Sequence, residues 1–297
     1  MRKLIFFFLL ISIAFQISAQ RNSDTTSKKQ TTLFTKKNAI VAGLVLQQAG
    51  SFIIEYQWWW KNEYHTFYFL PDGWFDNYSL GVDKVGHFYT SYLYFNVLNE
   101  LMKWGEFSDR TRIITSVALP FIYALSIEIG DGYSTYGFSY EDLTANSAGI
   151  LLGVLQDKIP VLQNFTIKWS YFPSPVSFDT HFKNWKLTDD YDGHIYWLSA
   201  DVHNLLPHNL KKFWPAFLNI AGGYGVDRYL HNVVYPDNWL PIQRKFFIGF
   251  DFNLSSIKTK SKSLNGILRI VDKYKFPAPG FKRTGDAPLQ PSLLMLN

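Results

Sequence analysis

Apolar residues recur every three or four positions along residues 83–104, which is the repeat of an amphipathic helix with one side toward a core and the other toward water. Two further helices are predicted, at residues 109–130, a strongly apolar stretch with an N-cap at Ser108, and at residues 139–158, which Pro160 ends. An apolar run at residues 39–54 predicts a helix ahead of these three. The N-terminal part is therefore expected to form a domain resembling a four-helix bundle.

Beyond Pro160 the apolar period shortens to two, which is the repeat of a β-strand. The clearest strand is residues 246–254, in which Phe246, Ile248 and Phe250 share one face with the apolar residues that follow. Further elements are predicted as strands at residues 217–226, 165–172 and 194–203, and as a short helix near residues 264–274. The expected fold class is α+β, with the helical domain followed by a small antiparallel β-sheet and a short C-terminal helix.

The first residues have the layout of a secretory signal peptide. Arg2 and Lys3 precede an apolar run, and Ala19 offers a cleavage point, so residues 1–19 are expected to be removed; an uncleaved membrane anchor is the alternative. The remaining segments are predicted as a flexible linker at residues 20–38, the helical domain at 39–160, a β-rich extension at 161–280 and a loose tail at 281–297.

The chain has 297 residues, 47% of them hydrophobic, and no cysteine. It can bury a sizeable core, but no disulfide can stabilise an exported form and no thiol can carry a lipid anchor. The formal charge of +5 comes from the signal and the linker, so the folded part is close to neutral. We therefore expect no nucleic-acid partner, and a membrane surface or another envelope component instead.

Polar side chains at helical spacing define the candidate site. Asp83 and His87 lie four residues apart, so on a helix they share one face. The same argument pairs Glu128 with Asp131 and Asp142 with Asn146. If the three helical faces converge, an imidazole, several carboxylates and an amide meet in one polar cluster.

Each of these residues also has a structural explanation. Asp83 suits the start of a helix, Asp131 suits a turn before Gly132, and Asp142 suits a capping box begun by Ser139. Glu128 is the most informative acid, because it ends a strongly apolar helix where an unpaired carboxylate is costly.

Small residues at Ala145, Gly149 and Gly153 form a groove on the same helix as Asp142, which favours close approach of a neighbouring helix. Three consecutive tryptophans at residues 58–60 follow the first helix. They suit either a membrane interface or an aromatic lid on a core.

The order Asp83-Lys84-x-x-His87-Phe88, then Glu128, then Asp142-x-x-x-Asn146-x-x-Gly149 resembles a family of predicted periplasmic YfiM-like proteins of unknown function. It is more distantly similar to VanZ-like membrane proteins. The resemblance covers about residues 38–160. It implies that His87, Glu128, Asp142 and Asn146 belong together and that the chain resides in the cell envelope, in the periplasm or at the outer membrane.

Three functions fit these observations. The favoured one is a structural or binding module at a membrane, in which a buried polar network fixes the helix register. The second is a membrane-surface hydrolase or metal-dependent enzyme, with His87, Glu128 and Asp142 as candidate catalytic residues or metal ligands. The third is a partial outer-membrane β protein. The sequence contains no motif that requires a cofactor.

Overall fold

The structure is a computed structural model that describes residues 35–178 and 187–296. The chain divides into two compact units. The helical unit holds residues 35–72 and Thr90–Val154, and the sheet unit holds Gly73–Tyr89 together with the described residues from Leu155 onward. The predicted signal peptide and linker residues 20–34 lie outside the described residues.

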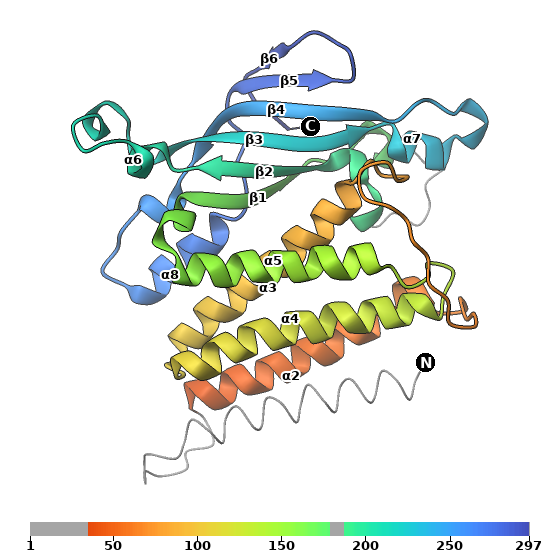
Figure 1. Ribbon diagram of the computed structural model, residues 1–297, viewed down its shortest axis with the longest axis horizontal. Coiled ribbons are helices and arrows are strands. Elements are labelled where there is room, and N and C mark those ends of the chain that lie inside the picture. The colour runs from red at the N-terminus through yellow and green to blue at the C-terminus, as the bar shows by residue number, and fades with distance from the viewer. Residues whose placement is uncertain (1–34, 179–186, 297) are drawn as a thin grey trace. The chain divides into compact units, whose positions relative to one another are not determined.

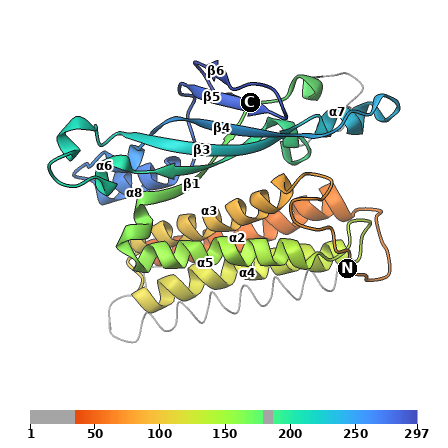
Figure 2. The ribbon, with the colours of Figure 1, turned by 45° about the horizontal axis from the view of Figure 1, so that its top comes forward.

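Four long helices occupy the N-terminal part of the described chain, as Figure 1 shows: α2 (Lys36–Glu55), α3 (Val82–Trp104), α4 (Asp109–Gly132) and α5 (Tyr140–Lys158). Helices α2, α4 and α5 lie alongside one another (Figure 2). The predicted bounds of α3, α4 and α5 agree with these to within two residues. The core of the helical unit is apolar at one end, where it is built from Ile40, Leu44, Leu98, Met102, Phe107 and Leu119.

Helix α2 is longer than predicted. It begins at Lys36, inside the predicted linker, because the side chain of Thr35 caps it by accepting from the amide of Asn38 at 3.2 Å. At its other end a π-helical turn, η1 (Tyr56–Trp60), continues the helix through the tryptophans. Sequence periodicity alone cannot detect this extension, because a π-turn shifts the helical phase.

The sheet unit contains six antiparallel strands in the order β1 to β6. They are β1 (Phe165–Tyr171), β2 (His194–Ala200), β3 (Leu218–Asp227), β4 (Gln243–Phe252), β5 (Gly280–Thr284) and β6 (Gln290–Ser292). Two short helices, α6 (Val202–Leu205) and α7 (Tyr229–Val234), lie at opposite ends of β3, and α8 (Lys262–Val271) precedes β5. The predicted α+β class is confirmed.

The prediction of a loose tail at residues 281–297 is wrong, because β5 and β6 extend the sheet there. Gly249 and Gly280 leave room for Met295, whose side chain is 3% exposed. The tail is therefore held by core packing that no local pattern reveals. The short helix predicted near residues 264–274 is present as α8, and the last two strands follow it along the chain.

The predicted seam near Pro160 also differs from the observed division, because Gly73–Tyr89 belongs with the sheet. Side chains of the sheet unit hold this segment. Arg244 donates to the carbonyl of Phe75 at 2.7 Å, and Tyr191 donates to Asp83 at 2.9 Å.

The sheet buries a face that is rich in polar residues. Its core contains Trp197 and Phe247, but also Lys168, whose ammonium group lies 2.7 Å from Asp251 and 2.9 Å from Asp272. The opposite face exposes large apolar side chains, namely Leu198, Ile220, Phe246, Ile248, Phe250, Phe252 and Phe281. The alternation of β4 is as predicted, but its aromatic face is the exposed one.

Candidate functional site

Glu128 is the centre of a polar group at the end of α4. Its side chain is 1% exposed, and its Oε2 accepts the backbone N–H of Ser139 at 3.1 Å. The hydroxyl of Ser139 donates to Asp72 at 3.0 Å and accepts the amide of Asp142 at 3.1 Å. Ser139 is therefore the predicted helix cap, and it also links Glu128 to the first turn of α5.

Asp131 lies inside α4 and has a role beyond the predicted turn. Its Oδ1 accepts the indole N–H of Trp60 at 2.7 Å, while its carbonyl accepts the amides of Ser134 and Gly137. Trp60 is 2% exposed, whereas Trp58 is 51% exposed. Of the two explanations for the tryptophan triplet, Trp60 thus fits the core lid and Trp58 remains available to a membrane interface.

Asn146 finds its partner on another helix. The hydroxyl of Ser91 on α3 donates to Asn146 Oδ1 at 2.7 Å, and both residues are buried. Ser91 was not among the predicted site residues, although it follows His87 by one helical turn and so shares its face. The small residues of α5 are also buried, and a Cβ at Gly153 would collide with the ring of Phe95.

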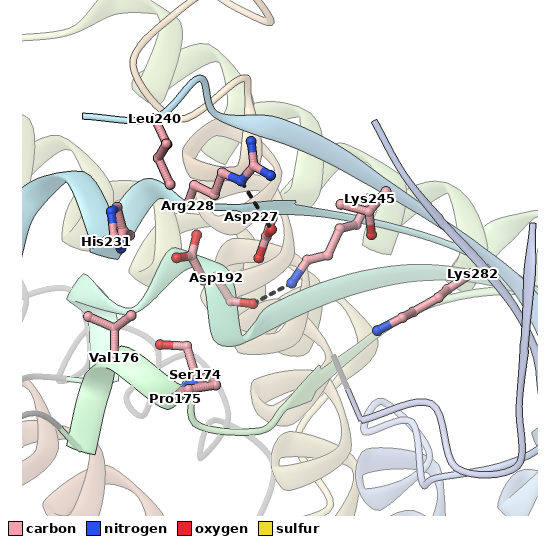
Figure 3. Close-up of a pocket in the computed structure, with 11 residues that line it drawn as sticks. Ser174, Pro175, Val176, Asp192, Asp227, Arg228, His231, Leu240, Lys245 and Lys282 are labelled. Carbon is pink, nitrogen blue, oxygen red and sulfur yellow. Dashed lines mark hydrogen bonds and ion pairs between the residues drawn. The ribbon is translucent and has the colours of Figure 1, made fainter. Parts of the chain in front are cut away.

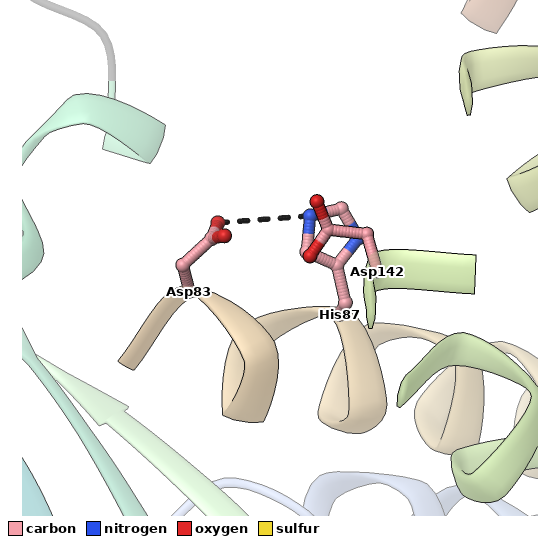
Figure 4. Close-up of side chains that lie close together, drawn as sticks. All are labelled: Asp83, His87 and Asp142. Atoms are coloured by element: carbon pink, nitrogen blue, oxygen red, sulfur yellow. Dashed lines mark ion pairs between the residues drawn. The ribbon is translucent and has the colours of Figure 1, made fainter. Parts of the chain in front are cut away.

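Asp83 forms a second polar group, which lies in the sheet unit. Figure 4 shows the imidazole of His87 turned toward it, with His87 Nε2 3.6 Å from Asp83 Oδ1. The ammonium of Lys84 lies 2.9 Å from Asp83 Oδ2, and the hydroxyl of Tyr191 donates to Oδ1 at 2.9 Å. Lys84 and Tyr191 were missed, because a lysine next to an acid and a tyrosine far along the chain give no periodic signal.

The electrostatics of this group favour a charged carboxylate. Burial raises the pKa of Asp83, but the charges of His87 and Lys84 and the hydrogen bonds from Lys84 and Tyr191 outweigh it and leave the pKa below its ordinary value. An imidazole 3.6 Å from an ionised carboxylate is suited to proton transfer or to metal ligation.

The predicted site residues thus divide between the two units. Asp83 and His87 lie in the sheet unit, and Glu128, Asp131, Asp142 and Asn146 lie in the helical unit. Within the helical unit, Ser139 joins Glu128 to α5, and Ser91 joins α3 to Asn146. That the two groups form one site stays a prediction.

One segment of the chain, which contains α3, α4 and α5, resembles a family of other proteins. Residues 71–158 match a family described as Predicted periplasmic lipoprotein (DUF2279). The matched segment contains all six residues of the predicted polar cluster, and it supports an exported protein with a periplasmic or envelope location. The finer resemblance to YfiM-like and VanZ-like proteins stays a prediction. Since the sequence contains no cysteine, none of its residues can carry the lipid of a lipoprotein. No curated protein and no solved structure matches the chain.

Proposed function

We propose that this protein is a membrane-attached module of the cell envelope, with structural or binding activity, whose helical unit enters the bilayer through the outer faces of α2 and α4. The observation that carries the proposal is the inverted pattern of α4, which buries polar side chains and turns apolar ones outward. A helix of a water-soluble bundle has the opposite arrangement.

Helix α4 shows the inversion most clearly. Its buried positions include the polar residues Thr111, Arg112, Thr115, Ser116, Ser126 and Glu128. Its outward side is apolar, with Ile114 43% exposed and Phe121 38% exposed. Polar groups in membrane helices face the bundle interior in this way, because lipid offers them no hydrogen bonds.

Helix α2 shows the pattern in part. It buries Gln48 and Glu55 beside the apolar Ile40, Leu44 and Phe52. Its outer side exposes Leu46 and Ile53, of which Leu46 is 72% exposed, and Trp58 is exposed in the turn η1 that follows. An exposed tryptophan near the end of an apolar helix suits the polar boundary of a bilayer.

Both helices are long enough to reach across a bilayer. The segments Lys36–Trp60 and Asp109–Gly132 have the length and apolar composition of a membrane span. Only 28% and 44% of their most apolar 18-residue stretches are buried. At about 1.5 Å per residue, the 25 residues of Lys36–Trp60 and the 24 of Asp109–Gly132 each exceed the roughly 30 Å of a hydrocarbon core. The core helix of a soluble protein can be equally long and apolar, but most of its apolar residues are buried.

The buried polar group would fix the register of the helices. The pairs Ser91–Asn146 and Ser139–Glu128 each require one relative position of the helices or turns that carry them. In a membrane, where apolar side chains pack against lipid as readily as against protein, such pairs specify one arrangement.

Vesicle flotation tests the attachment. The purified full chain is mixed with phosphatidylethanolamine and phosphatidylglycerol vesicles, floated, and washed with carbonate. We expect the wild-type protein to stay with the vesicles and the double variant Leu46→Glu/Ile53→Glu to be lost. Phe213→Glu is the matched control, since Phe213 is also 72% exposed but lies in the sheet unit. Wild-type protein left in the aqueous fraction, or equal loss of both variants, rejects the proposal.

A metal-dependent enzyme is the second candidate, because His87 lies 3.6 Å from an ionised carboxylate and is the one imidazole in the predicted cluster. Within the sheet unit Asp83 would be the further ligand or acid-base group, and Glu128 and Asp142 stay candidates from the sequence alone. Metal analysis of the purified wild type and the His87→Ala variant tests it. A metal-free protein whose variant only melts earlier excludes this function.

A further inference from the structure

A cavity of about 340 Å³ lies at one end of the sheet, within the sheet unit (Figure 3). Its wall is formed by side chains from β3, β4 and β5 and from the segment after β1. This volume falls at the lower end of the range for small-molecule sites, about 300 to 1,000 Å³.

Three cationic side chains line this cavity: Arg228, Lys245 and Lys282. Lys245 and Lys282 come from neighbouring strands and face the same side of the sheet, where their like charges oppose each other. Lys245 is only 4% exposed and donates to the carbonyl of Asp192 at 2.8 Å. The carboxylates of Asp227 and Asp192 offset part of this repulsion, and an anion in the cavity would offset more of it.

The hydroxyl of Ser174 is an independent sign of a ligand. Ser174 is 3% exposed, and its Oγ has no hydrogen-bond partner among the described residues. A buried hydroxyl is normally satisfied, so an unsatisfied one in a cavity wall indicates a missing partner. Arg228 adds a strained backbone at the same place, since its φ of 73° lies in the left-handed region that favours glycine.

Two carboxylates in the cavity wall, Asp192 and Asp227, limit the kinds of anion that the cavity can bind. Asp192 is already engaged, because its oxygens accept the amides of Tyr229 at 2.8 Å and Leu230 at 3.1 Å. Asp227 forms a long ion pair with Arg228, whose Nε lies 3.9 Å from Asp227 Oδ2, and its other oxygen can accept a hydrogen bond from a ligand hydroxyl. The cavity therefore suits one anionic group joined to a neutral, hydroxyl-bearing remainder.

We propose that this cavity binds a small polyol phosphate, with Arg228, Lys282 and Ser174 holding the phosphate oxygens and Asp227 accepting from a hydroxyl. The three terminal oxygens of a phosphate monoester provide more acceptor positions than the two of a carboxylate, which suits this number of donors.

Calorimetric titration of the purified full chain with glycerol 3-phosphate tests this site. We expect Lys282→Met to weaken binding about tenfold or more, and Ser174→Ala to weaken it by a smaller factor. Arg283→Met is the matched control, because Arg283 neighbours Lys282 on β5 but points to the opposite face, and its affinity should stay within about twofold of wild type.

Two results of this titration would overturn the proposal. No binding up to about 10 mM, or equal weakening by Lys282→Met and Arg283→Met, overturns the proposal. Glycerophosphoglycerol, the soluble headgroup of phosphatidylglycerol, is titrated in parallel. If this diester binds at least as tightly, the monoester assignment is wrong and a lipid headgroup is the source of the phosphate. The result does not depend on whether the helical unit enters a membrane.

Discussion

The backbone N–H of Ser139 donates to Oε2 of Glu128 at 3.1 Å, which ties the end of α4 to the start of α5. The carboxylate is 1% exposed, so it has lost nearly all contact with water. In exchange it satisfies an amide that precedes the first turn of a helix, where no intrahelical acceptor exists.

Replacing Glu128 should therefore destabilise the helical unit. Glu128→Ala leaves the amide of Ser139 buried without its acceptor, and we expect the free energy of unfolding to fall by about 1–3 kcal/mol. Chemical denaturation followed by circular dichroism measures it. Thr144→Ala, at an exposed position of α5, should change it by less than about 0.5 kcal/mol. Similar values for the two variants would mean that the Glu128 contact contributes little.

Two glycine substitutions should have opposite effects. A Cβ at Gly153 would collide with Phe95, so Gly153→Ala should destabilise the protein by about 1–3 kcal/mol. A Cβ at Gly43, on α2, meets nothing within 4 Å, so Gly43→Ala should stabilise it by about 0.5–1 kcal/mol. Thermal denaturation distinguishes them, and destabilisation by Gly43→Ala would contradict the open packing at that position.

The sheet unit should become more stable at alkaline pH, because the buried ammonium of Lys275 loses its charge there. Its side chain is 1% exposed, its ammonium lies 4.5 Å from the centre of the Trp197 ring, and burial lowers its pKa to about 8. The cost of the buried charge is full below pH 8 and disappears as the pH approaches the ordinary value of 10.5.

Lys275→Met should therefore raise the free energy of unfolding by about 3 kcal/mol at neutral pH. This advantage should shrink as the pH rises from 8 toward 10.5, which denaturation curves at several pH values measure. An advantage that does not change with pH would show that packing, not charge, is responsible.

The ionised carboxylate of Asp83 should stabilise the protein, and this stabilisation should be lost at acid pH. Its depressed pKa means that the carboxylate adds stability above its ordinary value of 3.8, and this stability is lost as the pH falls through the lower folded-state pKa. Asp83→Asn removes the carboxylate that pairs with the buried ammonium of Lys84, with an expected loss of about 3–5 kcal/mol at neutral pH. Melting curves should show the gap between variant and wild type closing below about pH 4. A constant gap would place the effect in packing instead.

Local sequence signals were sufficient for α3 to α5. The apolar period indicated α3, and the cap residues Ser108 and Ser139 marked the starts of α4 and α5. They could not identify contacts made between distant segments, such as Trp60 with Asp131 or Tyr191 with Asp83. Such pairs depend on tertiary packing, which a single sequence does not encode in any local pattern.

The sheet shows a second limit of prediction from the sequence. Alternation in β4 predicts that Phe246 and Ile248 share a face, but not whether that face is buried, since both faces repeat with a period of two. In this sheet the buried face of β4 carries Lys245 and Phe247. Strand β5 was missed because Lys282 and Arg283 interrupt its apolar residues.

Site-directed spin labelling tests membrane entry most directly, because a chain without cysteine accepts single labels at chosen positions. Leu46→Cys and Ile53→Cys report on the outer face of α2, and Phe213→Cys on the sheet unit. In vesicles, we expect labels at positions 46 and 53 to be accessible to oxygen and shielded from a water-soluble nickel complex, and the label at position 213 to show the reverse. Labels at 46 and 53 that are as accessible to the nickel complex as the label at 213 would contradict this expectation.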